Sequence, residues 1–242
     1  MNLLIQIFNE VLYRPLFNVL IWLYDVLPGH DLGIAIIILT AAIRLLLYPL
    51  SKKAIKSQKA LTGLQPKIKE IQKKYKDKAD QAKATMELYR QYRINPMSGC
   101  LPILIQLPIL IALYRVFFTG LDPEKLNGLY GFISRPELLN PMFLGIINLS
   151  QRSIFLSVLA GFLMFVQSKM MMSKGPASLG GGLKIKGLDF SSIMGQQMTY
   201  LMPLLTVFIA FGLPAGLPLY WAVITLFGII QQYFTKLPNQ ES

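Results

Sequence analysis

Apolar residues form five long runs along the chain, each close to the length needed to cross a lipid bilayer. The runs cover residues 32–51, 96–118, 153–172, 197–213 and 216–235. In the first run, about 19 residues at about 1.5 Å each nearly cover the roughly 30 Å of a hydrocarbon core. The last two runs are separated by so few residues that they must form a tight helical hairpin. The pattern predicts an all-α polytopic membrane protein with five transmembrane helices.

Residues 1–31 show a different pattern, in which apolar residues repeat on one helical face and polar residues occupy the other. Glu10 and Arg14 belong to the polar face, and Pro15 is expected to divide the stretch in two. Charges opposite an apolar face favour an amphipathic helix that lies in the membrane interface. An additional spanning helix remains the alternative.

The segment 52–94 is short and strongly basic, with 13 Lys and Arg against four acidic residues. Short basic loops stay in the cytoplasm, so this segment is predicted to be cytoplasmic. Its apolar residues repeat at spacings of three and four, which is typical of a short coiled-coil seam. The seam residues before the polar break at Asp77-Lys78 are Leu61, Leu64, Ile68, Ile71 and Tyr75. We therefore predict an antiparallel helical hairpin that projects into the cytoplasm.

The remaining loops agree with this orientation. Residues 119–152 carry three basic and three acidic side chains and are predicted to be extracytoplasmic. Residues 173–196 contain three lysines and a glycine-rich stretch, which predicts a flexible cytoplasmic loop. The short tail at 236–242 then lies in the cytoplasm, and the N-terminus lies outside.

Composition supports the membrane assignment and excludes several function classes. Hydrophobic residues make up 53% of the chain, charged residues 15%, and the mean hydropathy is +0.47, yet the formal net charge is +12. One cysteine and one histidine exclude an internal disulfide and predict no metal site or cofactor. Nucleotide-binding loops and hydrolase motifs are absent, so we predict that the protein is not an enzyme. The basic hairpin could contact phosphates of a large particle such as a ribosome, without specific nucleic-acid recognition.

Arg44 is a charged residue inside the first apolar run. On a straight helix it would lie about 12 Å from Lys52, too deep for its side chain to reach cytoplasmic water. Because an arginine facing lipid costs at least a few kcal/mol, Arg44 should face a water-containing cavity, with Thr40 one turn away on the same face. None of the five runs offers an acidic partner, which indicates an anionic ligand that arrives transiently. The alternative is an arginine that anchors the span near the inner interface.

Other polar residues also interrupt the apolar runs. Gln106 and Gln167 lie in the second and third runs, and Gln231 and Gln232 lie near the end of the fifth. Each glutamine alone could simply form a hydrogen bond between helices, and for Gln231 and Gln232 we favour that interpretation. Trp221 could belong to the aromatic belt at the outer interface.

Several sequence blocks resemble the YidC/Oxa/Alb family of membrane protein insertases. The blocks occur in the family's order from about residue 13 to 235: Ile37-Ile38-Leu39-Thr40-Ala41-Ala42-Ile43-Arg44, Tyr48-Pro49-Leu50, Leu64-Gln65-Pro66-Lys67-Ile68, Asn95-Pro96-Met97-Ser98-Gly99-Cys100-Leu101-Pro102, Ile105-Gln106-Leu107-Pro108-Ile109, Met202-Pro203, Leu219-Tyr220-Trp221 and Ile229-Ile230-Gln231-Gln232. Each block alone is modest, but together they are highly specific.

The resemblance implies five helices around a hydrophilic groove that opens to the cytoplasm and lipid. It further implies that Arg44, Thr40, Gln106, Gln167 and Trp221 line this groove or contact the substrate. A protein of this family inserts and folds nascent membrane proteins in the bacterial plasma membrane, alone or beside the Sec translocon, without nucleotide hydrolysis. Only about 30 residues precede the first run, which resembles family members without a large extracytoplasmic domain. The short tail leaves any ribosome contact to the hairpin.

Two other classes of protein remain alternatives. A small-solute or anion transporter could use Arg44 as its binding residue, although no inverted repeat relates the two halves of the chain. A passive assembly factor for other membrane complexes is the second alternative.

Overall fold

A computed structural model describes residues 2–95, 101–119, 128–134, 136, 139–171 and 190–235. The predicted tail at 236–242 lies outside the described residues, as does most of the predicted loop at 173–196. The described part of the chain is almost entirely helical, and one short β-hairpin is its only sheet.

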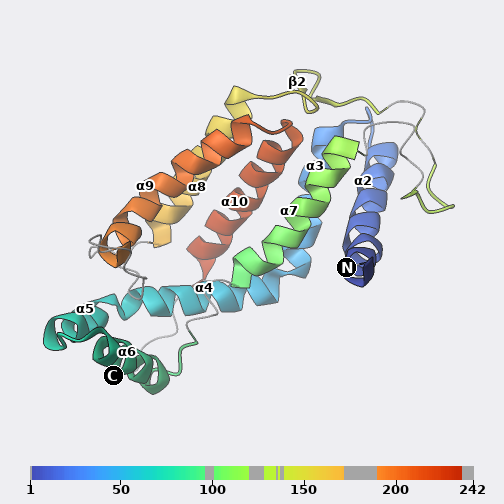
Figure 1. Cartoon of the computed structure of the whole chain (residues 1–242). Coiled ribbons are helices and arrows are strands. Elements are labelled where there is room, and N and C mark those ends of the chain that lie inside the picture. The colour runs from blue at the N-terminus through green and yellow to red at the C-terminus, as the bar shows by residue number, and fades with distance from the viewer. Residues whose placement is uncertain are drawn as a thin grey trace.

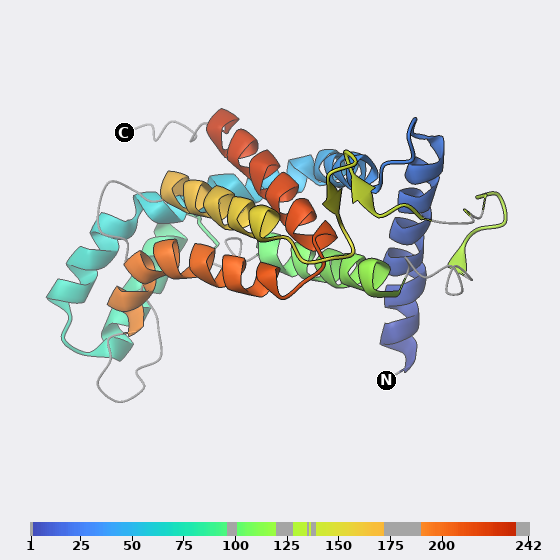
Figure 2. The same ribbon diagram turned by 90° about the horizontal axis from the view of Figure 1, so that it is seen from above.

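Five helices cover the five apolar runs: α3 (Leu32–Leu46), α7 (Leu101–Thr119), α8 (Ile154–Met171), α9 (Phe190–Phe211) and α10 (Gly216–Phe234). Helix α10 is central and packs against α3, α7 and α8, whereas α9 packs mainly on α8. Within α10, Leu217, Tyr220 and Ile224 are buried in the core. Helix α9 begins at Phe190, inside the segment predicted as a loop. Figure 2 shows α8 between α9 and α10, with all three away from α1 and α2.

Two described helices, α8 and α10, are each long and apolar enough to cross a bilayer. A third span results if α3 and the following helix are counted together. Shorter apolar stretches occur within α7 at Gln106–Val116 and within α9 at Tyr200–Phe211. These findings support a multi-pass membrane protein, while the number of five spans stays a prediction.

The first apolar run does not form one straight helix. Helix α3 ends at Leu46, and α4 (Tyr48–Gly63) continues at an angle of 69° to it. Pro49 lies in the first turn of α4, where its missing N–H and fixed φ angle are tolerated. Arg44 therefore lies in the last turn of α3, and the depth expected from a straight helix does not apply. Figure 1 shows α4 running beneath the ends of α7 and α10.

The basic segment continues from α4 into a helical hairpin formed by α5 (Gln65–Lys74) and α6 (Lys78–Gln91). The two helices pack against each other, and Leu64 and Ile68 of the predicted seam are 2% and 1% exposed. The chain leaves helical conformation between Tyr75 and Asp77, where the polar break was expected. The described hairpin thus begins at Gln65, because residues 52–63 extend α4 instead.

The N-terminal residues form a continuous helical segment: α1 (Asn2–Phe8), the π-helical η1 (Asn9–Tyr13) and α2 (Arg14–Val26). Pro15 does not divide the segment as expected, since it occupies the first turn of α2 directly after the wider π-helical turns. Helix α2 packs against α3 and α7. Apolar side chains also cover the outward side, including Leu3, Val11 and Val19.

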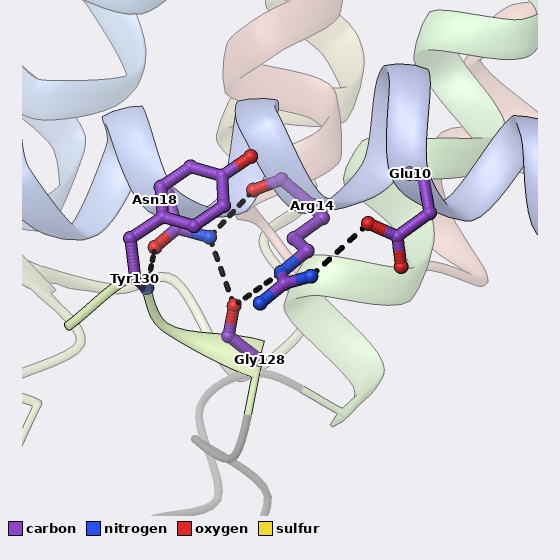
Figure 3. Close-up of polar contacts among 5 residues, drawn as sticks. All are labelled: Glu10, Arg14, Asn18, Gly128 and Tyr130. Carbon is purple, nitrogen blue, oxygen red and sulfur yellow. Dashed lines mark hydrogen bonds and ion pairs between the residues drawn. The ribbon is translucent and has the colours of Figure 1, made fainter.

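A polar cluster joins α2 to the segment between α7 and α8 (Figure 3). Asn18 is 1% exposed, and its amide donates to the carbonyls of Arg14 and Gly128 at 2.7 and 3.0 Å. Its carbonyl oxygen accepts the backbone N–H of Tyr130 at 2.6 Å. Arg14 also donates to Gly128 at 3.3 Å and pairs with Glu10 at 3.0 Å. The N-terminal helix is therefore attached to the predicted extracytoplasmic loop.

The strands β1 (Met142–Phe143) and β2 (Ile147–Asn148) pair antiparallel at one end of the helices. One carboxylate oxygen of Asp31 caps α3 at the Ile34 N–H (2.9 Å), and the other accepts the Leu144 N–H (2.6 Å). The N–H groups of Ala215 and Gly216 donate to carbonyls of Gln151 and Leu149. The segment around the hairpin therefore holds the N-terminal ends of α3 and α10 together.

Candidate functional site

A cavity of about 440 Å³ lies among α3, α4, α7, α8 and α10, and we call it the Arg44 cavity. Its polar lining residues are Arg44, Ser51, Gln58, Gln106, Gln167, Thr225 and Gln232. The remaining lining residues are mostly aliphatic, together with Trp221. Within the described residues, no Asp or Glu lines this cavity. The walls are therefore mixed, with one cation, several amides and hydroxyls, and a large apolar share.

Arg44 projects from the last turn of α3 towards α10. Its Nη2 donates to the Ile224 carbonyl at 2.7 Å, and its Nη1 forms a long contact of 3.5 Å with Oε1 of Gln231. Its Nε is buried and has no hydrogen-bond partner in the described part of the chain. A guanidinium carries five N–H donors, so two neutral acceptors leave it incompletely satisfied. Arg44 can consequently donate hydrogen bonds to a further ligand, and an anion would bind most strongly.

Gly228 lets α10 approach both Arg44 and Gln167. A Cβ atom at this position would collide with the side-chain nitrogen of Gln167 and would lie 3.5 Å from Nη2 of Arg44. Gln167 comes from α8 and Arg44 from α3, so three helices bring their polar groups together at this glycine. The sequence alone gave no reason to single out Gly228.

The other predicted site residues do not all border the Arg44 cavity. Gln106 lines the cavity from α7 and donates to the hydroxyl of the buried Tyr220. Trp221 lines the cavity from α10. Thr40 is not among the residues that line it; it is 1% exposed, and its hydroxyl donates to the Ile36 carbonyl at 2.6 Å. Four of the five predicted residues thus border one cavity, and the role of each in substrate binding stays a prediction.

The sequence interpretation missed Ser51, Gln58 and Thr225. Ser51 and Gln58 belong to α4, which reaches the cavity only because the chain bends after α3. A serine and a glutamine in a basic amphipathic segment carry no distinctive signal. Thr225 follows Trp221 by four residues and could have been found by helical spacing from it.

Gln232 was expected to form a hydrogen bond between helices. Its side chain is 3% exposed, and neither its Oε1 nor its Nε2 has a partner in the described residues. Its backbone carbonyl instead accepts a hydrogen bond from Lys59 of α4 at 2.8 Å. Lys59 also donates to the Thr235 carbonyl at 2.5 Å, so a cation from α4 caps the C-terminal end of α10.

Comparison with known proteins places this architecture in a family. The family model described as 60Kd inner membrane protein matches residues 22–241. The chain belongs to this family. A protein of Fusobacterium nucleatum named membrane protein insertase YidC is 36% identical over 205 residues, covering 84% of this chain and 85% of that relative. Another of the same name from Oceanobacillus iheyensis is 37% identical over 225 residues, covering 90% and 80%. The resemblance inferred from the sequence blocks is confirmed.

A solved structure supports the fold of this 60Kd inner membrane protein family member. The structure is described as an active YidC insertase crystal structure with the first transmembrane domain resolved, and it matches with a TM-score of 0.59 at 30% sequence identity. The match covers 95% of this chain but 47% of that chain, so the present chain spans about half of the longer protein.

Proposed function

We propose that this chain inserts nascent proteins into the bacterial plasma membrane and assists their folding, using the Arg44 cavity to receive a hydrophilic part of the substrate. The observation that carries this proposal is an arginine in a largely apolar cavity, with no carboxylate partner among the described residues. Membership of a family whose relatives are named membrane protein insertases supports the same activity. A solute transporter finds no support in these relatives.

The physical task of an insertase is to move a polar tail across a hydrocarbon core. Burying an unpaired charge or a peptide group in hydrocarbon costs several kcal/mol, and a cavity with polar walls lowers that cost. The guanidinium of Arg44 would bind a carboxylate of an acidic tail through charge-assisted hydrogen bonds. Partition of the substrate's apolar segment into lipid would then drive insertion, without nucleotide hydrolysis.

Further parts of the proposal concern topology and partners. Five spans, with the N-terminus outside and the C-terminus in the cytoplasm, would place the hairpin of α5 and α6 where ribosomes deliver nascent chains. The basic charge of residues 52–94 supports contact with anionic lipid or ribosomal phosphate. Cooperation with the Sec translocon follows from the family resemblance alone.

The proposal is tested by reconstituting Arg44→Ala and Arg44→Lys variants in lipid vesicles. The substrates are two single-spanning proteins that differ only in whether the translocated tail is acidic or uncharged, and insertion is measured as protease protection. Because a hydrogen bond to a charged group contributes about 1.5–3 kcal/mol, we expect Arg44→Ala to lower insertion of the acidic tail about tenfold or more. Arg44→Lys keeps the charge and should lose less.

Arg152→Ala is the matched control, since Arg152 is an exposed arginine outside the cavity. It should insert both substrates as the unaltered protein does. Equal insertion of the acidic tail by the unaltered protein and Arg44→Ala would contradict the electrostatic role of Arg44.

A further inference from the structure

Gln232 is a buried amide whose two side-chain polar atoms lack partners among the described residues. It is 3% exposed and borders the Arg44 cavity. Leaving such a group unsatisfied is unfavourable, and buried polar groups in native proteins are nearly always paired. An unpaired amide next to a cavity therefore points to a ligand that the cavity receives.

The location of Gln232 suggests where along the cavity this ligand binds. Trp221, Thr225, Gly228 and Gln232 all border the cavity and follow one another at spacings of four, three and four, so they form one stripe along α10. The stripe is about 16 Å long at 1.5 Å per residue. An extended peptide of about five residues would cover it. Gln232 lies at the end next to α4, where Lys59 donates to its backbone carbonyl, so the two atoms of its buried side-chain amide are the groups without a partner among the described residues.

Arg44 and Gln232 differ in which peptide groups they can hydrogen-bond. Arg44 has donors only, so it can bind carboxylates and carbonyl oxygens but cannot accept a peptide N–H. Every non-proline peptide unit carries one N–H and one C=O, and both must be satisfied away from water. The Oε1 of Gln232 can accept the N–H, and its Nε2 can donate to the carbonyl.

We propose that Gln232 binds a main-chain peptide group of the substrate tail, independently of the tail's sequence and charge. This inference rests on the proposed function and adds a second type of contact to the same cavity. Arg44 would discriminate in favour of acidic tails, whereas Gln232 would lower the cost of burying the backbone of any tail.

The test compares Gln232→Leu with the unaltered protein in vesicles, using the acidic-tailed and uncharged-tailed substrates described above. Because one neutral hydrogen bond contributes about 1 kcal/mol, we expect insertion of both tails to fall by the same factor, about fivefold. Arg44→Ala should reduce insertion of the acidic tail by a larger factor than that of the uncharged tail, because its hydrogen bonds to a carboxylate are the stronger ones. Gln151→Leu is the matched control, because Gln151 is exposed and lies outside the cavity; it should insert both tails normally.

Two outcomes would overturn the inference while the proposed function stands. Unchanged insertion by Gln232→Leu, beside a loss for Arg44→Ala, would mean that the amide holds only water. A loss confined to the acidic tail would mean that Gln232 acts through Arg44. If neither variant changes either tail, the electrostatic part of the proposed function fails as well.

Thermal unfolding in detergent separates a binding role from a structural one. Replacing an unsatisfied buried amide with an apolar side chain should leave the unfolding temperature of Gln232→Leu unchanged or raise it. A lowered unfolding temperature together with lost insertion would indicate a structural hydrogen bond and overturn the inference. Gln232→Met, with an unbranched side chain of similar length, provides the same comparison if the leucine variant does not fold.

Discussion

Gly228 determines how closely polar side chains from α3 and α8 approach α10. An added Cβ would meet the far end of Gln167, a flexible side chain that can move aside at low cost. Gly228→Ala should therefore change stability by less than about 1 kcal/mol, because the better helix propensity of alanine offsets the small rearrangement. It should nevertheless lower insertion, since the amide of Gln167 and the guanidinium of Arg44 are displaced. Unfolding temperature and insertion yield in vesicles measure the two effects separately.

Gly161 provides the contrasting case for this prediction. A Cβ there would collide with the Val207 side chain and approach the Pro203 carbonyl at 3.0 Å, at the contact between α8 and α9. A backbone carbonyl cannot rotate away, so Gly161→Ala should lower the unfolding temperature clearly. Equal stability losses in the two alanine variants would contradict the assignment of Gly228 to the cavity rather than to helix packing.

The residue pattern singled out polar side chains that interrupt an apolar run, whereas only the family resemblance implied that Gln106 and Gln167 line a groove. Arg44, Gln106 and Gln167 stand out in this way, because placing such groups in a span is costly. The same reasoning cannot find Gln58, since glutamine is ordinary in a basic amphipathic helix. The hydrogen bond between helices that was expected for Gln232 is not found among the described residues. An apolar run indicates that an amide within it is buried, but not whether a hydrogen-bond partner lies within reach.

Lys59 attaches α4 to the C-terminal end of α10. In the predicted orientation this is the cytoplasmic end. Lys59→Met keeps the aliphatic stem but removes the donor from the Gln232 and Thr235 carbonyls. A cation at a helix C-terminus contributes about 0.3–1 kcal/mol. We expect amide hydrogen exchange in α4 and in the last turn of α10 to become up to about fivefold faster. Lys56→Met removes an exposed lysine from the same helix and should leave exchange unchanged.

The attachment of the N-terminal helix depends on Asn18. Asn18→Ala leaves the Tyr130 N–H without its acceptor and should cost about 1–3 kcal/mol. The loop between α7 and α8 should then be cleaved faster by protease in detergent. Asn9→Ala removes an exposed hydrogen bond from Arg115 and should have little effect. If the unaltered protein, Asn18→Ala and Asn9→Ala were cleaved at the same rate, Asn18 would not attach the N-terminal helix to this loop.

The helices themselves were largely predictable, but their bends and joints were not. Apolar periodicity continues to Leu50 because the first turn of α4 still borders the cavity, so the run looks like one straight span. Pro49 is a local signal for the bend at Leu47, because proline breaks or kinks a helix near the residue before it, but its position does not give the 69° direction that α4 takes. Likewise, Asn18 belongs to the polar face of the amphipathic pattern in residues 1–31, which gives no sign that its amide is buried in contacts with a segment about 110 residues away.

The whole molecule has two different ends, and the orientation of these ends can be tested. The β-hairpin lies at one end, and α4, α5 and α6 lie at the other (Figure 1). The charge distribution predicts that the helical hairpin faces the cytoplasm. Because Cys100 is the only cysteine, Cys100→Ser provides a background for single-cysteine labelling with a membrane-impermeant maleimide. The positions for labelling are exposed residues: Ile146 in the β-hairpin and Met86 in α6.

We expect Ile146→Cys to be labelled on intact spheroplasts and Met86→Cys only after permeabilisation, because α6 would be shielded by the bilayer. Glu10→Cys distinguishes the two positions of the N-terminal helix. Glu10 is exposed, and its surface ion pair with Arg14 contributes little to stability. A helix on the outer interface would leave position 10 open to the reagent from outside, whereas a spanning helix would bury it in lipid and prevent labelling from either side. Labelling of Met86→Cys in intact spheroplasts would contradict the predicted topology. The end of the Arg44 cavity that α4 borders would then face away from the cytoplasm, where nascent chains are made.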